Sequence, residues 1–130
     1  MMAPENSQAT GRVVEMQVSG LVGPALDWAI ELALGGVRDG HRVDFPCGYW
    51  CIGLYQPSVE WRQGGLLIET HQIELSWDGV DGKALWWKAS HQDIVQFQMG
   101  ETPLIAACRA IVAAHLGEVV SVPAELVENK

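Results

Sequence analysis

The chain of 130 residues has eight Lys and Arg against sixteen Asp and Glu, a formal net charge of −8, and 48% of its residues are hydrophobic. Such a length and composition are typical of one globular domain with its own core. The basic residues are scattered, so we expect no phosphate-neutralising patch and no direct binding of nucleic acid. No apolar run approaches the roughly 18 residues of a membrane helix, and the polar start lacks a signal-peptide segment. We therefore expect a cytoplasmic domain that makes no membrane contact.

Both ends of the chain are expected to lie outside the packed domain, which we place at 12–123. Residues 1–11 are polar and aperiodic, which predicts a disordered extension, and residues 124–130 are expected to fray. Between these ends, residues 12–18 alternate apolar and polar side chains. This alternation predicts a half-buried strand, and the apolar residues 119–122 predict a short last strand.

Two helices are predicted from their start and stop signals. Pro24 fits the first turn of one helix, which Gly35 and Gly36 end, and its wheel places Asp27 and Glu31 opposite the apolar face. The second helix, 103–116, has the stronger signals. Thr102 caps its start, Pro103 fits its first turn and Gly117 stops it.

The second helix also has a face made of alanine, where a solvated helix would carry charged side chains. Alanine favours helices, which is the simple explanation. The alternative is that the face is covered, by the first helix, by the 37–57 segment or by a second subunit in a homodimer. The residues of this face are Ala106, Ala107, Ala110, Ala113 and Ala114.

The middle of the chain is expected to be mostly strands and loops. Residues 37–57 read as a loop with one short strand at 49–54, and 57–63 as a helical turn that Gly64 and Gly65 stop. Strands are predicted at 66–70, 73–77, 84–89 and 94–99, the second and third forming a hairpin across the Asp78-Gly79 and Asp81-Gly82 turn dipeptides. The fold class is therefore α+β, a mainly antiparallel sheet of four to six strands with two helices packed on it.

Three cysteines without a signal segment indicate free thiols in a reducing compartment. Cys47 and Cys51 have a spacing that half of a zinc site can use, completed by His41, His71 or Cys108. A second ligand pair at similar spacing is missing from the sequence. We expect no metal, and because phosphate-loop, dinucleotide and HExxH motifs are also missing, no cofactor.

Two motifs and two shorter fragments form a recognisable set. They are Tyr55-x-Pro57-Ser58-x-x-Trp61-x-x-Gly64-Gly65-x-x-Ile68-Glu69, Thr102-Pro103-Leu104-Ile105-Ala106-Ala107-x-Arg109, Leu26-Asp27-Trp28-Ala29 and Leu116-Gly117-x-x-Val120-x-Val122-Pro123. In this combination the chain resembles the NinX-like family of small phage and prophage proteins. The resemblance runs from about Val18 to Leu126 and departs from the family pattern in the N-terminal extension, in residues 36–52 and at Cys108, where methionine is expected. It implies a phage-derived accessory protein acting in a bacterial cytoplasm, and it implies no reaction.

The leading functional hypothesis is a non-enzymatic module that binds an unknown protein or a small ligand. A loop rich in Gly, Pro and aromatic residues is a common carrier of function, although the same residues also build rigid corners. Trp86 and Trp87 point to opposite faces of one strand, so one of them is a candidate interface anchor. The candidate binding surface is Tyr55, Pro57, Ser58, Trp61, Gly64, Gly65 and Arg109.

Two other functions remain open. An enzyme of unrecognised type would need a pocket that holds two acid–base groups from among Glu60, Glu69, His71 and His91. An acidic mimic that blocks a DNA-binding protein would need the sixteen carboxylates gathered on one face.

Arg109 lies at the edge of the apolar stripe of the second helix. A guanidinium there can bury its stem and pair with a carboxylate, and we favour this structural role. The functional alternative is a free head group that grips an anion near the 55–65 turn. The candidate partners for a structural pair are Asp27, Glu31, Glu60 and Glu69.

Overall fold

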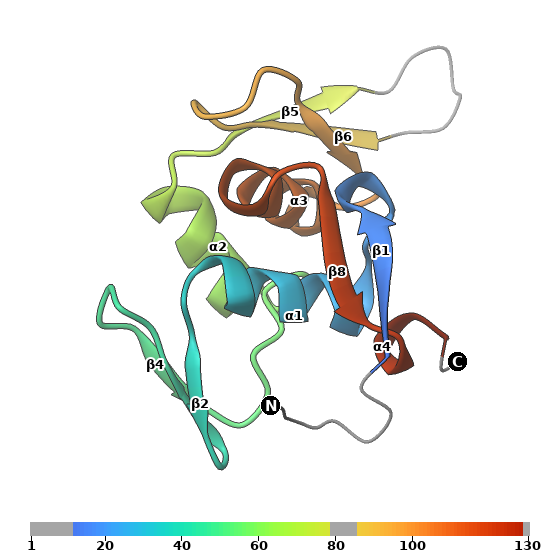
Figure 1. The fold of residues 1–130 in the computed structure, drawn as a ribbon. Coiled ribbons are helices and arrows are strands. Elements are labelled where there is room, and N and C mark those ends of the chain that lie inside the picture. The colour runs from blue at the N-terminus through green and yellow to red at the C-terminus, as the bar shows by residue number, and fades with distance from the viewer. Residues whose placement is uncertain (1–11, 79–85, 129–130) are drawn as a thin grey trace.

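Helix α3, Pro103–Leu116, lies at the centre of the molecule (Figure 1). The computed structural model describes residues 12–78 and 86–128, so the expected N-terminal extension and the turn at 79–82 lie outside the described residues. The helix starts and stops as predicted. The Thr102 Oγ1 atom accepts a 3.1 Å hydrogen bond from the Ile105 N–H, and Gly117 ends the helix at a φ of 90°. Its residues are buried continuously from Ala106 to Ala113.

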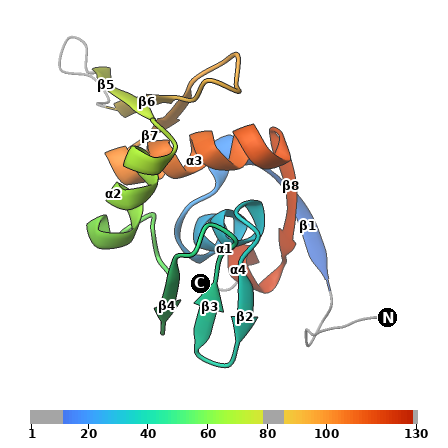
Figure 2. The same cartoon turned by 90° about the vertical axis from the view of Figure 1, so that its left-hand side faces the viewer.

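The alanine face of α3 is covered by the same chain. Helix α1, Gly23–Ala33, packs on one side of α3. Strands β6, Trp86–Ser90, and β7, Gln98–Gly100, pack on the other side, with α2, Trp61–Thr70, alongside (Figures 1 and 2). Strand β7 approaches so closely that a Cβ atom on Gly100 would overlap the backbone nitrogen of Ala106. Small side chains are needed for this approach. Of the alternatives considered for covering the alanine face, the structure shows the same chain, and not a second subunit, over residues 106–113.

The strands form three small antiparallel sheets, which confirms the α+β class but replaces the expected single sheet. The first is a ribbon of β1, Val13–Gln17, and β8, Val119–Pro123, which pairs Val13 with Pro123. The second has the order β2-β3-β4 and projects from one end of the molecule (Figure 2). The third has the order β5-β6-β7 and covers α3. The bounds of these last six strands are β2 Val37–Asp39, β3 Arg42–Asp44, β4 Trp50–Ile52, β5 Glu74–Asp78, β6 Trp86–Ser90 and β7 Gln98–Gly100.

The interpretation of 37–57 as a loop with one strand is corrected by the β2-β3-β4 sheet. Its strands have three residues each, too short for an alternating pattern to stand out. Gly40, at a φ of 64°, turns the chain between β2 and β3. Val43 and Phe45 are buried and fix the sheet to the core.

Helix α2, Trp61–Thr70, occupies the segment where a stop and a strand were expected. Gly64 and Gly65 lie inside the helix. Glycine is required at position 64 by close packing. A Cβ atom at this position would overlap the carbonyl oxygen of Pro57 and come within 2.6 Å of Leu104 Cδ2. The predicted strand at 66–70 is therefore wrong.

The other expected elements need smaller corrections. The first strand, the first helix, the β5–β6 hairpin pairing and the last strand are confirmed. The strand predicted at 94–99 is reduced to β7, since residues 95 and 96 form a bend, residues 94 and 97 have no regular structure, and Val95 is fully exposed. Residues 124–128 differ from the expected frayed tail. They form a turn and the short helix α4, Glu125–Glu128, and the buried Ala124 donates its N–H to the Arg12 carbonyl at 3.0 Å.

Candidate functional site

The Tyr55 turn, residues 54–60, connects β4 to α2 and is held by hydrogen bonds on both sides. On the α1 side, Asp27 Oδ1 accepts a 2.8 Å bond from the Ser58 N–H. On the α2 side, the Gln63 amide accepts from the Gln56 N–H at 2.6 Å and donates to the Leu54 carbonyl at 3.2 Å. Tyr55, Pro57 and Ser58 are buried. The turn is thus a rigid element and not a mobile loop.

Asp27 was expected on the solvent side of α1, and the structure corrects this. Asp27 is 8% exposed. Burial raises the pKa of its carboxyl group, and the hydrogen bond from Ser58 works in the opposite direction. The Ser58 hydroxyl is itself buried without a hydrogen-bond partner among the described residues.

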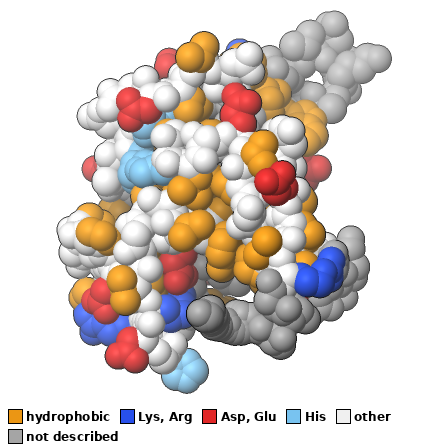
Figure 3. Space-filling model, viewed as in Figure 1, with side chains coloured by type: hydrophobic (Ala, Val, Ile, Leu, Met, Phe, Trp, Pro, Cys, Tyr) orange, Lys and Arg blue, Asp and Glu red, His pale blue; other side chains and the backbone are white. Residues whose placement is uncertain are grey.

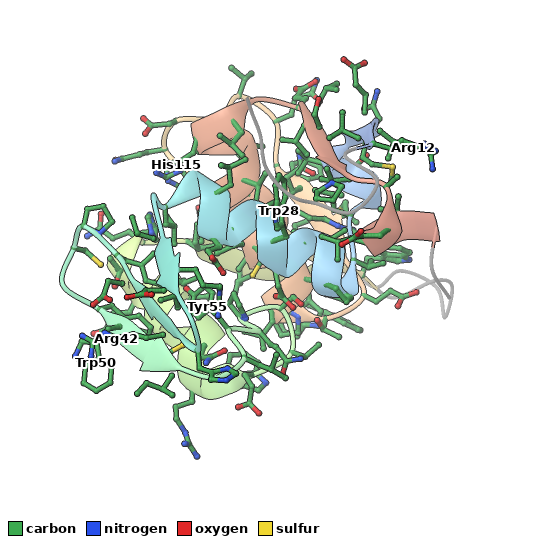
Figure 4. The ribbon with its side chains drawn as sticks, turned by 60° about the horizontal axis from the view of Figure 1, so that its bottom comes forward. Arg12, Trp28, Arg42, Trp50, Tyr55 and His115 are labelled. Atoms are coloured by element: carbon green, nitrogen blue, oxygen red, sulfur yellow. The ribbon has the colours of Figure 1, made fainter. Side chains whose placement is uncertain are left out.

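A groove of about 480 Å³ runs between α1 and the Tyr55 turn. Trp28 and Tyr55, labelled in Figure 4, both line it. Leu54 and Val59 contribute exposed apolar side chains, 74% and 61% accessible. At its rim, Arg38 Nη2 lies 2.9 Å from Glu31 Oε1, and Arg38 Nε donates to the other carboxylate oxygen at 3.2 Å. The groove therefore combines apolar side chains with a charged edge.

A second cavity, of about 130 Å³, lies on the other side of Tyr55 between the β3–β4 connection and α2. The rings of Phe45, Tyr49 and Tyr55 form its aromatic wall, with centroids 4.9 to 6.1 Å apart. Burial raises the pKa of Tyr55, which therefore stays neutral. Cys47 and His71 also line the cavity.

Three histidines that are far apart in sequence meet beside α2, where a pale blue patch is visible in Figure 3. The ring centroids of His71, His91 and His115 lie 5.6 to 6.3 Å apart. Burial lowers the pKa of His71, and the His115 and His91 rings lower it further. The Nδ1 atom of His91 accepts the Asp93 N–H at 3.0 Å, so the lone pair of this nitrogen is already engaged in a hydrogen bond.

Metal binding has no geometric support among the described residues, where no group of three or more His, Cys, Asp or Glu side chains could hold a metal ion. The three cysteines are free thiols, with Cys47 exposed, Cys51 half-buried and Cys108 buried. Burial raises the pKa of Cys108, which keeps this thiol protonated and unreactive.

Arg109 does not form the structural ion pair that we favoured. No carboxylate of the described residues lies within 4.0 Å of its guanidinium; Asp27 bonds to Ser58 and Glu31 to Arg38. Its Nε donates instead to the Leu21 carbonyl at 2.9 Å, and its Nη1 to the Met99 carbonyl at 2.6 Å. Arg109 also lines a pocket to which residues 54–65 contribute nothing, so the expected surface is divided between two places.

The remaining expected site residues have separate roles. Trp61 is exposed at the first turn of α2, and Gly64 and Gly65 serve the packing of that helix. Trp87 packs on the core with its ring 5.1 Å from that of Trp77. Trp86 faces the Arg109 pocket.

The two alternative functions gain little from this geometry. Of the four acid–base candidates, the 130 Å³ cavity contains His71, and Glu60 and Glu69 are exposed. On the face shown in Figure 3, carboxylates are dispersed among apolar and neutral groups, which does not favour an acidic mimic. Among the described residues, no helix is long and apolar enough to cross a membrane.

Fold and site together define a small α+β protein with clefts on two sides of a hydrogen-bonded turn. Comparison with known families then gives its relationship. Residues 17–115 match the family described as Bacteriophage P22, NinX, and the chain belongs to this family. No protein with curated annotation matches the chain.

Proposed function

We propose that this NinX family member is a non-enzymatic accessory module that acts in the cytoplasm of a bacterial host and binds a protein through the groove beside the Tyr55 turn. Membership of a phage family supports the accessory role. The observation that carries the binding site is the groove itself, where exposed Leu54 and Val59 lie next to the Arg38–Glu31 ion pair.

The composition of this groove suits a protein partner. Exposed apolar side chains grouped in a concave surface mark interaction sites more often than isolated ones do. Trp28 offers a large ring at the groove wall, and the ion pair at the rim can fix the orientation of a partner through its charges. Because Asp27 and Gln63 hold the turn, binding would lose little conformational entropy.

The proposal can be tested with two matched variants in host lysate. A tagged Leu54→Glu, Val59→Glu double variant carries charges in the groove, and a Val37→Glu variant carries one on β2, where Val37 is also exposed. We expect one protein to be retained by the wild type and by Val37→Glu, and to be lost from the double variant. Equal retention by all three proteins, or by none, would contradict the proposal.

A small apolar ligand is the second candidate, and the aromatic wall of the 130 Å³ cavity favours it. An apolar cavity of about 150 Å³ is large enough for benzene. Titration with benzene should shift methyl signals of Leu34 and Leu67 if the cavity accepts a ligand, and should leave exposed Leu54 unchanged.

A further inference from the structure

Arg109 lines a polar pocket of about 240 Å³. The residue is 5% exposed. Strand β7 and the 3-10 turn Val18–Gly20, η2, contact each other and α3, and residues of both line the pocket. The two backbone hydrogen bonds to Leu21 and Met99 fix the head group in place.

Part of this cation is open to the pocket, because none of its nitrogens is among the fully buried polar atoms of the described residues that lack a partner. A guanidinium has five N–H donors, and the two bonds to carbonyls leave the Nη2 group without a protein acceptor among the described residues. Burial lowers the pKa of Arg109, and the carboxylate of Glu101 works against this effect. Arg109 thus has a carboxylate that influences it at longer range but no direct ion pair within the described part of the chain, and buried charges are normally paired or bound to a ligand.

The pocket offers further groups that can hold an anionic molecule. Amide side chains of Gln17, Gln96 and Gln98 line it and can donate hydrogen bonds. The rings of Trp86 and Phe97 add apolar surface. The volume is below the range of about 300–1,000 Å³ that drug-sized ligands occupy, which indicates a smaller molecule.

We propose that Arg109 binds the carboxylate or phosphate group of a small ligand in this pocket. The Nη2 group makes the charge-assisted hydrogen bond, and the glutamine amides complete the coordination of the oxyanion. This site is independent of the proposed protein-binding groove, because the two share no lining residue.

Glu118 also lines the pocket, and changing it tests whether ligand binding depends on the charges around Arg109. Its carboxylate repels an anion bound at Arg109, so Glu118→Gln should tighten binding about two- to five-fold, the range of a partly exposed charge contact. Glu118 is exposed, so this substitution leaves the core intact. Glu125→Gln makes the same change of charge on α4, away from the pocket, and is the matched control.

The experiment is a titration of the ¹⁵N-labelled full chain with sodium acetate and, separately, with inorganic phosphate, against sodium chloride at equal ionic strength. We expect saturable shifts of the Arg109 Nε–H and of the Ser19 and Met99 amides at millimolar anion, tighter in Glu118→Gln and unchanged in Glu125→Gln. Saturation by acetate alone assigns a carboxylate ligand, and saturation by phosphate alone a phosphate. Equal shifts with chloride, no saturation with either anion, or equal effects of the two variants would overturn the proposal.

Discussion

The carboxylate of Asp27 on α1 accepts a 2.8 Å hydrogen bond from the backbone N–H of Ser58, and this contact fixes the Tyr55 turn to the helix that forms the other wall of the groove. Both residues are buried. The position of the groove therefore depends on this contact together with the two Gln63 hydrogen bonds on the α2 side of the turn.

Replacing Asp27 with alanine should destabilise the protein by about 1–3 kcal/mol, because the buried Ser58 N–H loses its acceptor. Asp27→Asn keeps an oxygen acceptor and should stay within about 1 kcal/mol of the wild type. Urea unfolding at neutral pH measures both. Similar losses in the two variants would mean that the charge, and not the hydrogen bond, is what matters.

The stability difference between the wild type and Asp27→Asn should depend on pH. Burial raises the folded-state pKa of Asp27 above about 3.8, so the folded protein binds a proton more readily than the unfolded chain. As pH falls from the raised pKa to about 3.8, the wild type should gain stability relative to Asp27→Asn. Denaturant midpoints measured for both proteins across this window test the sign, and a constant difference would refute it.

The adjacent glycines of α2 should respond to alanine in opposite directions. Gly64→Ala should cost about 1–3 kcal/mol, since the new methyl group overlaps the Pro57 carbonyl and Leu104. At Gly65 the new methyl group would meet Trp61 Cε3 at an ordinary 3.6 Å, so Gly65→Ala should stabilise by about 0.5–1 kcal/mol through helix propensity. Thermal unfolding of the two variants distinguishes two reasons for the glycines. A need for space at Gly64 would lower the unfolding temperature of Gly64→Ala alone, whereas a need for a flexible backbone would lower it in both variants.

Acid should weaken the protein through the histidine cluster. Burial, with the His115 and His91 rings, lowers the folded-state pKa of His71 below about 6.5, so the folded state favours the neutral ring. Stability that is fully present above pH 6.5 is lost as the pH falls towards the lowered pKa. His71→Gln should lose less stability between about pH 7 and 5 than the wild type. His41→Gln, which changes an exposed histidine outside the cluster, should behave as the wild type does.

Arg109→Met should cost on the order of 1–3 kcal/mol, because the Leu21 and Met99 carbonyls lose their donor. Removal of an unpaired buried charge offsets part of this loss. Arg62→Met changes an exposed arginine of α2 and should be nearly neutral. Unfolding in urea compares the two, and equal stabilities would show that the two carbonyl contacts contribute little.

The features that could be predicted from the sequence are those with local causes. Thr102, Pro103 and Gly117 determine the ends of α3 through their own backbone and side-chain chemistry. The prediction that Gly64 stops a helix was wrong because glycine is needed there for close packing against Pro57 and Leu104, and no local sequence pattern reveals that contact.

The candidate sites have the same limitation. The sequence predicts that Asp27 is solvated because it gives no sign of a hydrogen-bond partner. The partner is a backbone N–H, a group that every residue except proline carries. Arg109 was placed correctly at a buried edge, but its acceptors are carbonyl oxygens, and the sequence could suggest only carboxylates. Nothing in the spacing of His71, His91 and His115 indicates that they meet.

The β1–β8 ribbon pairs Val13 with Pro123, so it can form only after nearly the whole described chain has turned back on itself. The entropy lost in closing a loop grows with its length, and contacts between distant residues slow folding. We expect the helices to assemble first and this pairing to complete folding. We expect a pairing that forms last to be the part that opens most easily in the native state. The ribbon amides, such as those of Val14 and Met16, should therefore exchange hydrogen with solvent faster than the amides buried in α3.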